Sequence, residues 1–318
     1  MTGFQEYLNH VKPIVDARIN KVASRKLKDD YLVRLLMRGK RFRAGLLSLV
    51  FESTSGKNLN GTVDLACAVE LAHSASLIID DMLDEDETRR GMPTVHITEG
   101  QKRAMLDAVG ILSLPYDLVV PYGERFVQSL AETQRGMASG VLKEVLHDPE
   151  LPASMIYDLI IKQKTGKPFG LAASWGYLAG LNGARSGANG HMQKWTAYGV
   201  HVGKAMQIAD DIADLDRVMR TRKKTGAGSE LLLLRCVTAE RLATELFSDI
   251  RRMTLHFEKA RELWSRDGVQ ESLRLKLRRE ITAAQKTVLD LRLARPANKD
   301  LLIAAPDEIA QIMLAETK

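Results

Sequence analysis

This chain of 318 residues has few of the features that mark several common protein classes. It has only two cysteines, Cys67 and Cys236, so a disulfide framework is not expected and a reducing cytosol is the natural setting. None of its nine prolines lies between Pro168 and Pro296. No run approaches the roughly 18 apolar residues of a membrane span, and the N-terminus lacks the apolar core of a signal peptide. We therefore expect a cytoplasmic protein without a transmembrane segment.

Aromatic residues are also scarce, at 5% of the chain, and no basic stretch alternates with them as in grooves that bind single-stranded nucleic acid. Nucleic acid is therefore not expected as a partner. The net charge of +6 fits either an ordinary solvated basic surface or attraction to anionic ligands or an anionic membrane face. Hydrophobic residues make up 45% of the chain, which is enough to bury a large core.

Helical periodicity dominates what is present, and no convincing alternation with a period of two occurs. We find neither a linker-like segment nor an internal repeat, so we predict one all-α domain spanning residues 1–318, with roughly ten or more helices. Apolar residues recur at intervals of three and four in Leu65–Leu83, Met155–Ile161, Trp195–Met219 and Ala239–Trp264. Breaks are predicted at Gly56–Gly61, Arg90–Thr94, Pro115–Gly123, His147–Pro152, Leu181–Gly190 and Arg222–Ser229.

Two aspartate clusters with the spacing D-D-x-x-D fall inside predicted helices. The first and fifth positions of this spacing project from one side of a helix, one turn apart. Mg²⁺ typically binds a few carboxylates together with waters and substrate phosphates. Two facing clusters would therefore suit several Mg²⁺ ions around a diphosphate. The clusters are Asp80, Asp81 and Asp84, and Asp210, Asp211 and Asp214.

Residues around the clusters fit the same chemistry. His73 and Leu77 precede Asp80 on one helical stripe, and Arg89 and Arg90 follow, where guanidinium groups suit phosphate oxygens. A solvated acidic helix end followed by a basic turn would give the same pattern. Around the second cluster the stripe contains Lys204, Gln207, Asp211 and Asp214, with Asp210 adjacent. A surface helix with Lys–Asp pairs is the alternative there.

Two further basic elements are candidates for diphosphate contacts. Lys40 and Arg43, within Gly39–Arg43, would share a face of the helix expected over Ala44–Phe51. Cations at a helix start oppose the helix dipole, which mildly favours a functional role over an ordinary basic helix start. Lys164 and Thr165 lie beside Gly166, which suits either a phosphate contact or a plain helix end.

Taken in order, these elements resemble the trans-isoprenyl diphosphate synthase, or polyprenyl synthetase, family. The resemblance covers roughly residues 35 to 220 and is strongest from Glu70 to His96. It implies an all-α helical bundle of the isoprenoid synthase type around a central cavity, Mg²⁺ as cofactor, allylic and homoallylic diphosphates as substrates, and a homodimer. Val141 and Glu144 stand where the family has glutamine and aspartate in its G-Q-x-x-D element.

The resemblance also implies roles residue by residue. Asp80, Asp81 and Asp84, with Asp210 and Asp214, would hold Mg²⁺ on the allylic diphosphate, and Asp211 completes the second cluster. Arg89 would grip that diphosphate, and Lys204 would join it. The isopentenyl diphosphate would be bound by Lys40, Arg43, His73 and Arg90. Lys164, Thr165 and Gln207 would line the reacting centre.

The expected reaction ionises an allylic diphosphate, and the alkene of isopentenyl diphosphate attacks the resulting cation. Ala75 and Ser76, both small, lie about 6–8 Å below Asp80 along the helix, so we expect a C20 product or longer. Small residues that merely permit close helix packing are the alternative. Two other functions fit the fold, namely an ionisation-initiated terpene cyclase and a weakly active regulatory subunit of a heteromeric synthase.

Overall fold

The computed structural model describes residues 3–89, 91–146, 153–181, 188–221 and 268–315, together with 233, 264 and 265. Some predictions lie outside this part of the chain: the break at His147–Pro152, most of the break at Leu181–Gly190, the whole loop Arg222–Ser229, nearly all of the helix Ala239–Trp264, and residues Arg90 and Cys236. The architecture given below is that of the described residues.

Helices make up almost all of the described chain. They are α1 (Phe4–Lys26), α2 (Asp30–Leu36), α3 (Phe42–Ser55), η1 (Leu59–Thr62), α4 (Val63–Leu83), α5 (Val95–Thr98), α6 (Gln101–Val119), η2 (Val120–Tyr122), α7 (Glu124–Leu146), α8 (Ala153–Ile161), the π-helix η3 (Lys162–Gly166), α9 (Lys167–Gly180), α10 (Ala188–Thr221), α14 (Val269–Leu289), η5 (Pro296–Asn298) and α15 (Lys299–Ala315). A two-stranded antiparallel pair, β1 (Thr88–Arg89) and β2 (Met92–Pro93), follows α4.

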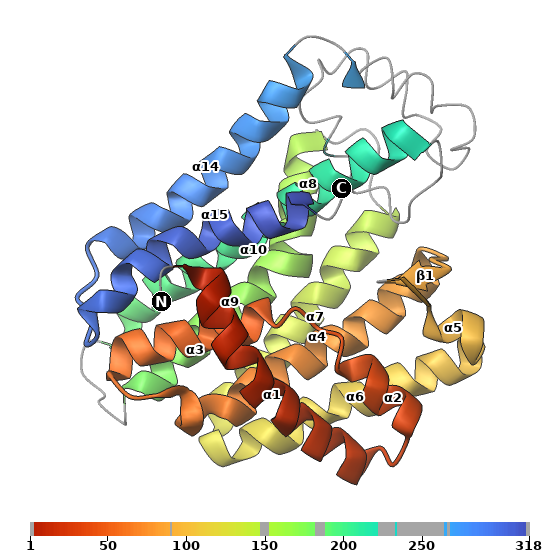
Figure 1. Ribbon diagram of the computed structural model, residues 1–318, viewed down its shortest axis with the longest axis horizontal. Coiled ribbons are helices and arrows are strands. Elements are labelled where there is room, and N and C mark those ends of the chain that lie inside the picture. Colours follow the sequence, from red (N-terminus) through yellow and green to blue (C-terminus); the bar gives the residue numbers. More distant parts are fainter. Residues whose placement is uncertain are drawn as a thin grey trace.

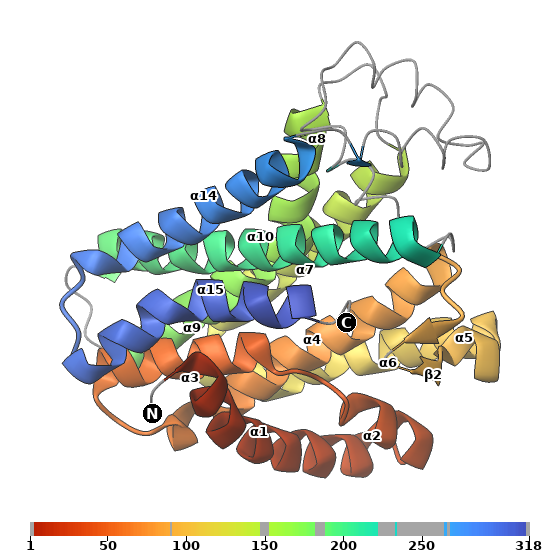
Figure 2. The same cartoon turned by 45° about the horizontal axis from the view of Figure 1, so that its top comes forward.

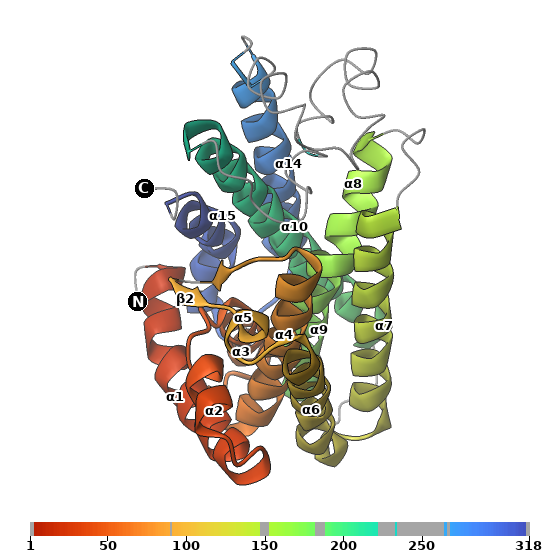
Figure 3. The same cartoon turned by 90° about the vertical axis from the view of Figure 1, so that its right-hand side faces the viewer.

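The helices form a bundle in which α4, α9 and α10 occupy the interior (Figure 1). α4 packs most extensively against α6, and α9 lies between α3 and α10. α14 and α15 cover the other side of α10, which runs the length of the molecule (Figure 2). Figure 3 shows α7 and α8 along one side of the bundle and α1 along the other. At its C-terminal end α4 approaches η3, which itself packs against α7 and α10, and the chemistry-bearing residues gather there.

The all-α prediction is confirmed, and three of the four periodic runs correspond to α4, α8 and α10. One predicted break is misplaced, because α6 continues through Pro115 and ends at Val119. The proline removes one backbone donor, but its buried ring packs in the core, so tertiary packing outweighs the local cost. The β1–β2 pair was not predicted, since two-residue strands leave no periodic signal.

Two helical segments, Leu59–Leu83 and Gln101–Tyr122, are long and apolar enough to cross a membrane by length and composition alone. Core helices of soluble proteins pass the same test. Here 61% of the first window and 44% of the second are buried inside the structure, and the first carries the aspartate cluster. The buried apolar residues of both segments include those that pack α4 against α6.

Candidate active site

The first aspartate cluster lies at the C-terminal end of α4 and faces a lysine from another helix. Nζ of Lys164 is 3.8 Å from Oδ1 of Asp80 and donates a 2.9 Å hydrogen bond to Oε2 of Glu144. Lys164 belongs to η3 and Glu144 to α7, so three elements bring their charges together. Glu144 therefore pairs directly with the predicted reacting-centre lysine.

Burial and crowding of like charges shape the electrostatics here. Burial raises the pKa of Asp84 to about 7; Lys164 opposes this shift, and the carboxylates Asp80 and Glu144 reinforce it. Burial lowers the pKa of Lys164, but the surrounding carboxylates outweigh that effect and raise its pKa overall, so the ammonium stays charged. One lysine thus faces several carboxylates, and the site has an excess of negative charge that a cation would relieve.

Asp81 has a different partner from Asp80, which faces Lys164. It is buried and accepts a hydrogen bond from Nε of Arg89 in β1, whose Nη2 also lies 3.7 Å from Oδ2 of Asp86. Burial raises the pKa of Asp81, and Arg89 partly offsets this. The β1–β2 pair therefore places Arg89 at the first cluster, as predicted.

A π-helical turn joins α8 to α9 and carries Lys164 and Thr165. Such turns widen a helix locally and often occur at functional sites. Gly203 of α10 allows the close approach of that turn, because a Cβ at this position would lie 2.7 Å from the carbonyl oxygen of Thr165. Thr165 Oγ1 then donates a 2.7 Å hydrogen bond to Oε1 of Gln207. The structure brings these three predicted reacting-centre residues to one place.

The second cluster lies on α10 and is more fully engaged with the protein. Asp211 is 2% exposed, and its two carboxylate oxygens accept hydrogen bonds from Gln207 Nε2 at 3.0 Å and from the Tyr157 hydroxyl at 2.5 Å. Asp214 pairs with Arg217 one turn on, and Asp210 is half-buried. Asp210 and Asp214 are partly exposed and remain the metal-ligand candidates of this cluster, whereas Asp211 is bonded within the protein interior.

Lys204 lies in an ion pair between helices. Its Nζ donates to Oε1 of Glu280 in α14 at 2.5 Å and is 4.0 Å from Oδ1 of Asp158. Nδ1 of His201 is 2.7 Å from the other oxygen of Glu280. Hydrogen bonds from His201 and Lys204 hold the pKa of Glu280 below its usual value, although burial opposes this. This ion pair ties α10 to α14.

The donor set fits Mg²⁺, although no group of three His, Cys, Asp or Glu side chains converges among the described residues. Mg²⁺ usually takes only one or two protein carboxylates and completes its shell with waters and substrate phosphates. Asp80 and Asp84 on one helix, with the raised pKa of Asp84, match such an open site. Asp210 and Asp214 would hold ions from the side of α10.

The basic cluster at the start of α3 divides into two roles. Arg41 is 1% exposed; its Nε donates to Asp16 at 2.6 Å and its Nη1 lies 3.8 Å from Glu70. Gly39 leaves room for that guanidinium, since a Cβ there would lie 2.1 Å from Nη1. The charge of Arg41 therefore stays inside the protein.

The two predicted ligands of this cluster lie on either side of Arg41. Nζ of Lys40 is 3.0 Å from Sδ of Met313 in α15 and 5.7 Å from the centre of the Phe42 ring. The Arg43 guanidinium is buried and stacks 4.7 Å above the Phe169 ring. Of the pair, Lys40 is the more accessible to a ligand.

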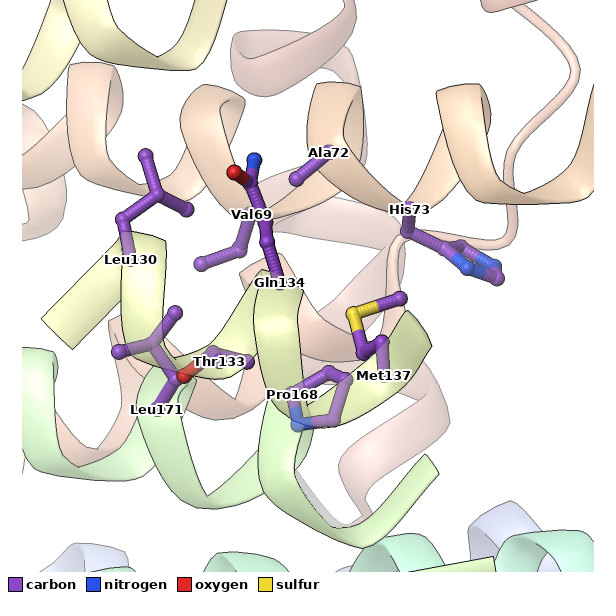
Figure 4. Close-up of a pocket in the computed structure, with 9 residues that line it drawn as sticks. All are labelled: Val69, Ala72, His73, Leu130, Thr133, Gln134, Met137, Pro168 and Leu171. Atoms are coloured by element: carbon purple, nitrogen blue, oxygen red, sulfur yellow. The ribbon is translucent and has the colours of Figure 1, made fainter. Parts of the chain in front are cut away.

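A small apolar pocket opens between α4, α7 and α9 (Figure 4). His73 lies at one end of it, and the other lining residues are Val69, Ala72, Leu130, Thr133, Gln134, Met137, Pro168 and Leu171. Ser76 lies one turn from His73 toward Asp80, and its hydroxyl donates a 2.8 Å hydrogen bond to the carbonyl oxygen of His73. Ala75 is fully buried and is not among the lining residues.

Two residues at the site were not predicted as functional. Tyr157 lies seven residues before Lys164, close to two helical turns, so its position on the same face was a signal that spacing could have provided. Arg41 was grouped with its basic neighbours, and only its left-handed backbone conformation, with φ of 66°, turns it inward. The sequence contains no pattern that predicts that conformation.

Comparison with curated proteins gives relatives of one kind. The chain is 32% identical over 186 residues to a geranylfarnesyl diphosphate synthase of Methanosarcina mazei, a match covering 58% of this chain and 61% of that protein. It is 29% identical over 230 residues to a farnesyl diphosphate synthase of Geobacillus stearothermophilus, covering 67% and 75%. A geranylgeranyl diphosphate synthase of Pseudescherichia vulneris is 33% identical over 191 residues, covering 55% and 60%.

Solved structures share the fold. A heptaprenyl diphosphate synthase from Staphylococcus aureus superposes with a TM-score of 0.80 at 22% identity, covering 96% of this chain and 98% of that one. A polyprenyl synthase from Caulobacter crescentus, complexed with calcium and isoprenyl diphosphate, superposes with a TM-score of 0.79 at 23% identity, covering 98% of both chains. The sequence profile of the polyprenyl synthetase family matches residues 26–229, about two thirds of the chain. The chain belongs to the polyprenyl synthetase family.

Proposed function

We propose that this protein is an Mg²⁺-dependent prenyltransferase that condenses an allylic diphosphate with isopentenyl diphosphate. One observation carries the proposal: Asp80 and Glu144 pair with a single charged lysine, Lys164, which also acts electrostatically on Asp84. His73, two turns before Asp80 on α4, lines a small apolar pocket. Such a site favours a polyvalent cation and a diphosphate above a hydrocarbon chain. The names of the curated relatives support the reaction type.

Each group at the site has a task in this reaction. When bound, Mg²⁺ would neutralise charge that develops on the diphosphate as it leaves. Lys164 and Arg89 would bind the same oxygens, and Lys40 and Arg43 would bind the second diphosphate. Thr165 and Gln207 present polar oxygens beside the carbon that becomes cationic. The proton lost after condensation would pass to the released diphosphate, so no histidine base is required.

The product is proposed to be C20 or longer. The pocket stripe on α4 contains Val69, Ala72 and His73, and Ser76 continues it toward the cluster. Ser76 and Ala72 lie one and two turns below Asp80, about 6 and 12 Å at 1.5 Å per residue. Their small side chains leave the growing chain a path into the apolar pocket, which would also keep water from the cation.

We also propose a cytoplasmic homodimer formed through α6. Three large apolar side chains on this helix are more than half exposed: Met105, Leu106 and Val109. Together with Val120 in η2 they form a face that a second copy of the chain would cover. Sedimentation equilibrium should give twice the monomer mass of 35.4 kDa, and Leu106→Glu should shift it toward the monomer.

Product analysis tests the catalytic proposal. Purified protein would be incubated with Mg²⁺, isopentenyl diphosphate and one of three allylic primers, and the chain lengths of the products measured. We expect prenyl diphosphates of C20 or longer, and none when isopentenyl diphosphate is omitted. A hydrocarbon formed from the allylic substrate alone would indicate a cyclase instead. No product from any primer would favour a regulatory subunit.

A further inference from the structure

Tyr157 of α8 is a fully buried residue whose hydroxyl group reaches the second aspartate cluster. It donates a 2.5 Å hydrogen bond to Oδ2 of Asp211, while Oδ1 accepts from Gln207 Nε2 at 3.0 Å. The other end of the Gln207 amide accepts from Thr165 Oγ1 at 2.7 Å. Four side chains from α8, α10 and η3 are therefore joined by three hydrogen bonds that end at the reacting centre.

The chemistry of these groups fixes the direction of each hydrogen bond. An ionised carboxylate can only accept, whereas a primary amide has one accepting and one donating end. Asp211 therefore turns Nε2 of Gln207 toward itself, and Oε1 of Gln207 must face Thr165. The single hydroxyl hydrogen of Thr165 is then used on Gln207, so only its lone pairs are left for a group in the cavity. Reversing the amide would leave its oxygen facing a carboxylate oxygen of Asp211, so that two acceptors meet with no hydrogen between them.

Tyr157 is itself held in place by a charged residue of α14, Lys276. Nζ of Lys276 lies 5.5 Å from the centre of the Tyr157 ring and 3.1 Å from Oδ1 of Asp158, the next residue. A cation over the ring stabilises its position in the protein. The tyrosine is thus fixed on one side by α14, and its hydroxyl is directed at Asp211 on the other.

Building on the proposed function, we infer that Tyr157 and Asp211 are positioning residues for the condensation. They orient the Gln207 amide and, through it, the Thr165 hydroxyl, so that oxygen lone pairs face the allylic carbon as it becomes cationic. In this assignment Asp211 is not a metal ligand, although it occupies the second position of a D-D-x-x-D cluster. Asp210 and Asp214 keep the predicted role at the metal.

Steady-state kinetics of Tyr157→Phe test the inference, with Tyr198→Phe as matched control. Tyr198 is equally buried and its hydroxyl donates at 2.7 Å to the carbonyl oxygen of Leu302, away from the site. We expect kcat of Tyr157→Phe to fall about tenfold, the equivalent of one hydrogen bond, with KM for both diphosphates unchanged. Equal kcat values for the two variants, at equal melting temperature, would overturn the inference.

The dependence on metal separates positioning from ligation. Asp211→Asn keeps only one of the two oxygens that accept from Gln207 and Tyr157. One of these two hydrogen bonds is therefore lost in its present direction, so kcat should fall while the half-saturating Mg²⁺ concentration stays within about twofold of wild type. A metal ligand would instead raise that concentration strongly. A rise of tenfold or more in Asp211→Asn would therefore contradict the assignment of Asp211.

A measurement without turnover keeps the inference apart from the proposed function. The side-chain amide signals of Gln207 in ¹⁵N-labelled protein can be assigned by their loss in Gln207→Glu. We expect these signals to shift and to exchange faster with solvent in Tyr157→Phe but not in Tyr198→Phe. Absence of prenyl product from wild type would refute the proposed function, whereas unchanged Gln207 signals in Tyr157→Phe would refute the positioning role.

Discussion

The two aspartate clusters have the same spacing but differ in what surrounds them. On α4, Asp80 and Asp84 share one cation, Lys164, with Glu144, and burial raises the pKa of Asp84 to about 7. On α10, both oxygens of Asp211 accept hydrogen bonds from the protein, and Asp214 pairs with Arg217. In the first cluster several carboxylates crowd around one lysine, whereas in the second Asp211 and Asp214 are each held by their own partners within the fold. Equal spacing therefore predicts a shared face but not a shared role.

The largest expected effect concerns the first cluster. Asp80→Ala should reduce turnover about 10³-fold, because a carboxylate contact to a phosphate-bound Mg²⁺ is worth several kcal/mol in the transition state. The half-saturating Mg²⁺ concentration should rise as well. The fold should survive, since removing one carboxylate relieves repulsion on Asp84. Turnover close to wild type at saturating Mg²⁺ would show that the first cluster does not hold the metal.

The basic cluster likewise contains one residue that is paired inside the protein, Arg41, and one that is accessible to a ligand, Lys40. A variant of Arg41 tests the internal pairing. Arg41→Met should destabilise the protein by about 3–5 kcal/mol, because it leaves the buried Glu70 without its cation and the partly buried Asp16 with Lys12 alone. Urea unfolding would measure the loss. A loss below 1 kcal/mol would mean that this buried pairing contributes little.

A variant of Lys40 tests whether the accessible residue of the basic cluster binds a diphosphate. Lys40→Ala should raise KM for isopentenyl diphosphate about 10- to 100-fold, the equivalent of one hydrogen bond between charged groups, and leave KM for the allylic primer nearly unchanged. Initial rates with each substrate varied in turn provide the measurement. A change in the primer KM instead would show that the two diphosphate sites are exchanged.

Much of this architecture follows from sequence periodicity. The apolar spacing over Leu65–Leu83 and Trp195–Met219 predicts the two helices that carry the clusters, and the structure extends both by a few residues. Long helices are predictable because each buries a continuous stripe, which repeats in the sequence. The π-helical turn at Lys162–Gly166 has no such repeat, so the position of Lys164 relative to Glu144 depends on tertiary packing.

The candidate site was less predictable than the fold. Lys164, Thr165 and Gln207 come together as predicted from the family resemblance. The sequence gives no sign that Lys204 differs from these residues. Its pairing with Glu280 depends on α14, which lies far along the chain. Arg41 illustrates the same limit, since its partners Asp16 and Glu70 lie on α1 and α4. Spacing gives the face of a helix, and only packing gives the partner.

A smaller effect, on product length, compares two adjacent residues below the first cluster. Ser76→Phe should place an aromatic ring at the pocket entrance and shorten the product by one isoprene unit or more, to about C15. Ala75→Phe changes the other small residue that the sequence places below Asp80, but Ala75 is fully buried and is not among the residues that line the pocket. Chain-length analysis of both variants identifies the residue that faces the growing chain. Unchanged products in both would place the limit on another helix.

The smallest effect tests the paired charges that support α10. Hydrogen bonds from His201 and Lys204 hold the pKa of Glu280 below its usual 4.5, although burial opposes them. Because the folded pKa is lowered, the stabilisation is present above pH 4.5 and is lost as pH falls through the folded value. Glu280→Gln should therefore be less stable than wild type by about 1 kcal/mol at pH 7, and this difference should shrink in acid.

Urea unfolding at pH 7 and at pH 4 would measure that difference, with Glu271→Gln on the same helix as control. Glu271 pairs with Arg278 but its side chain is 66% exposed, so its removal should cost little at either pH. If Glu280→Gln loses the same free energy of unfolding at pH 7 and at pH 4, the carboxylate acts through its shape and not through its charge. A deficit confined to neutral pH would show that α14 holds α10 by electrostatic pairing, because the same side chain loses its effect once it is protonated.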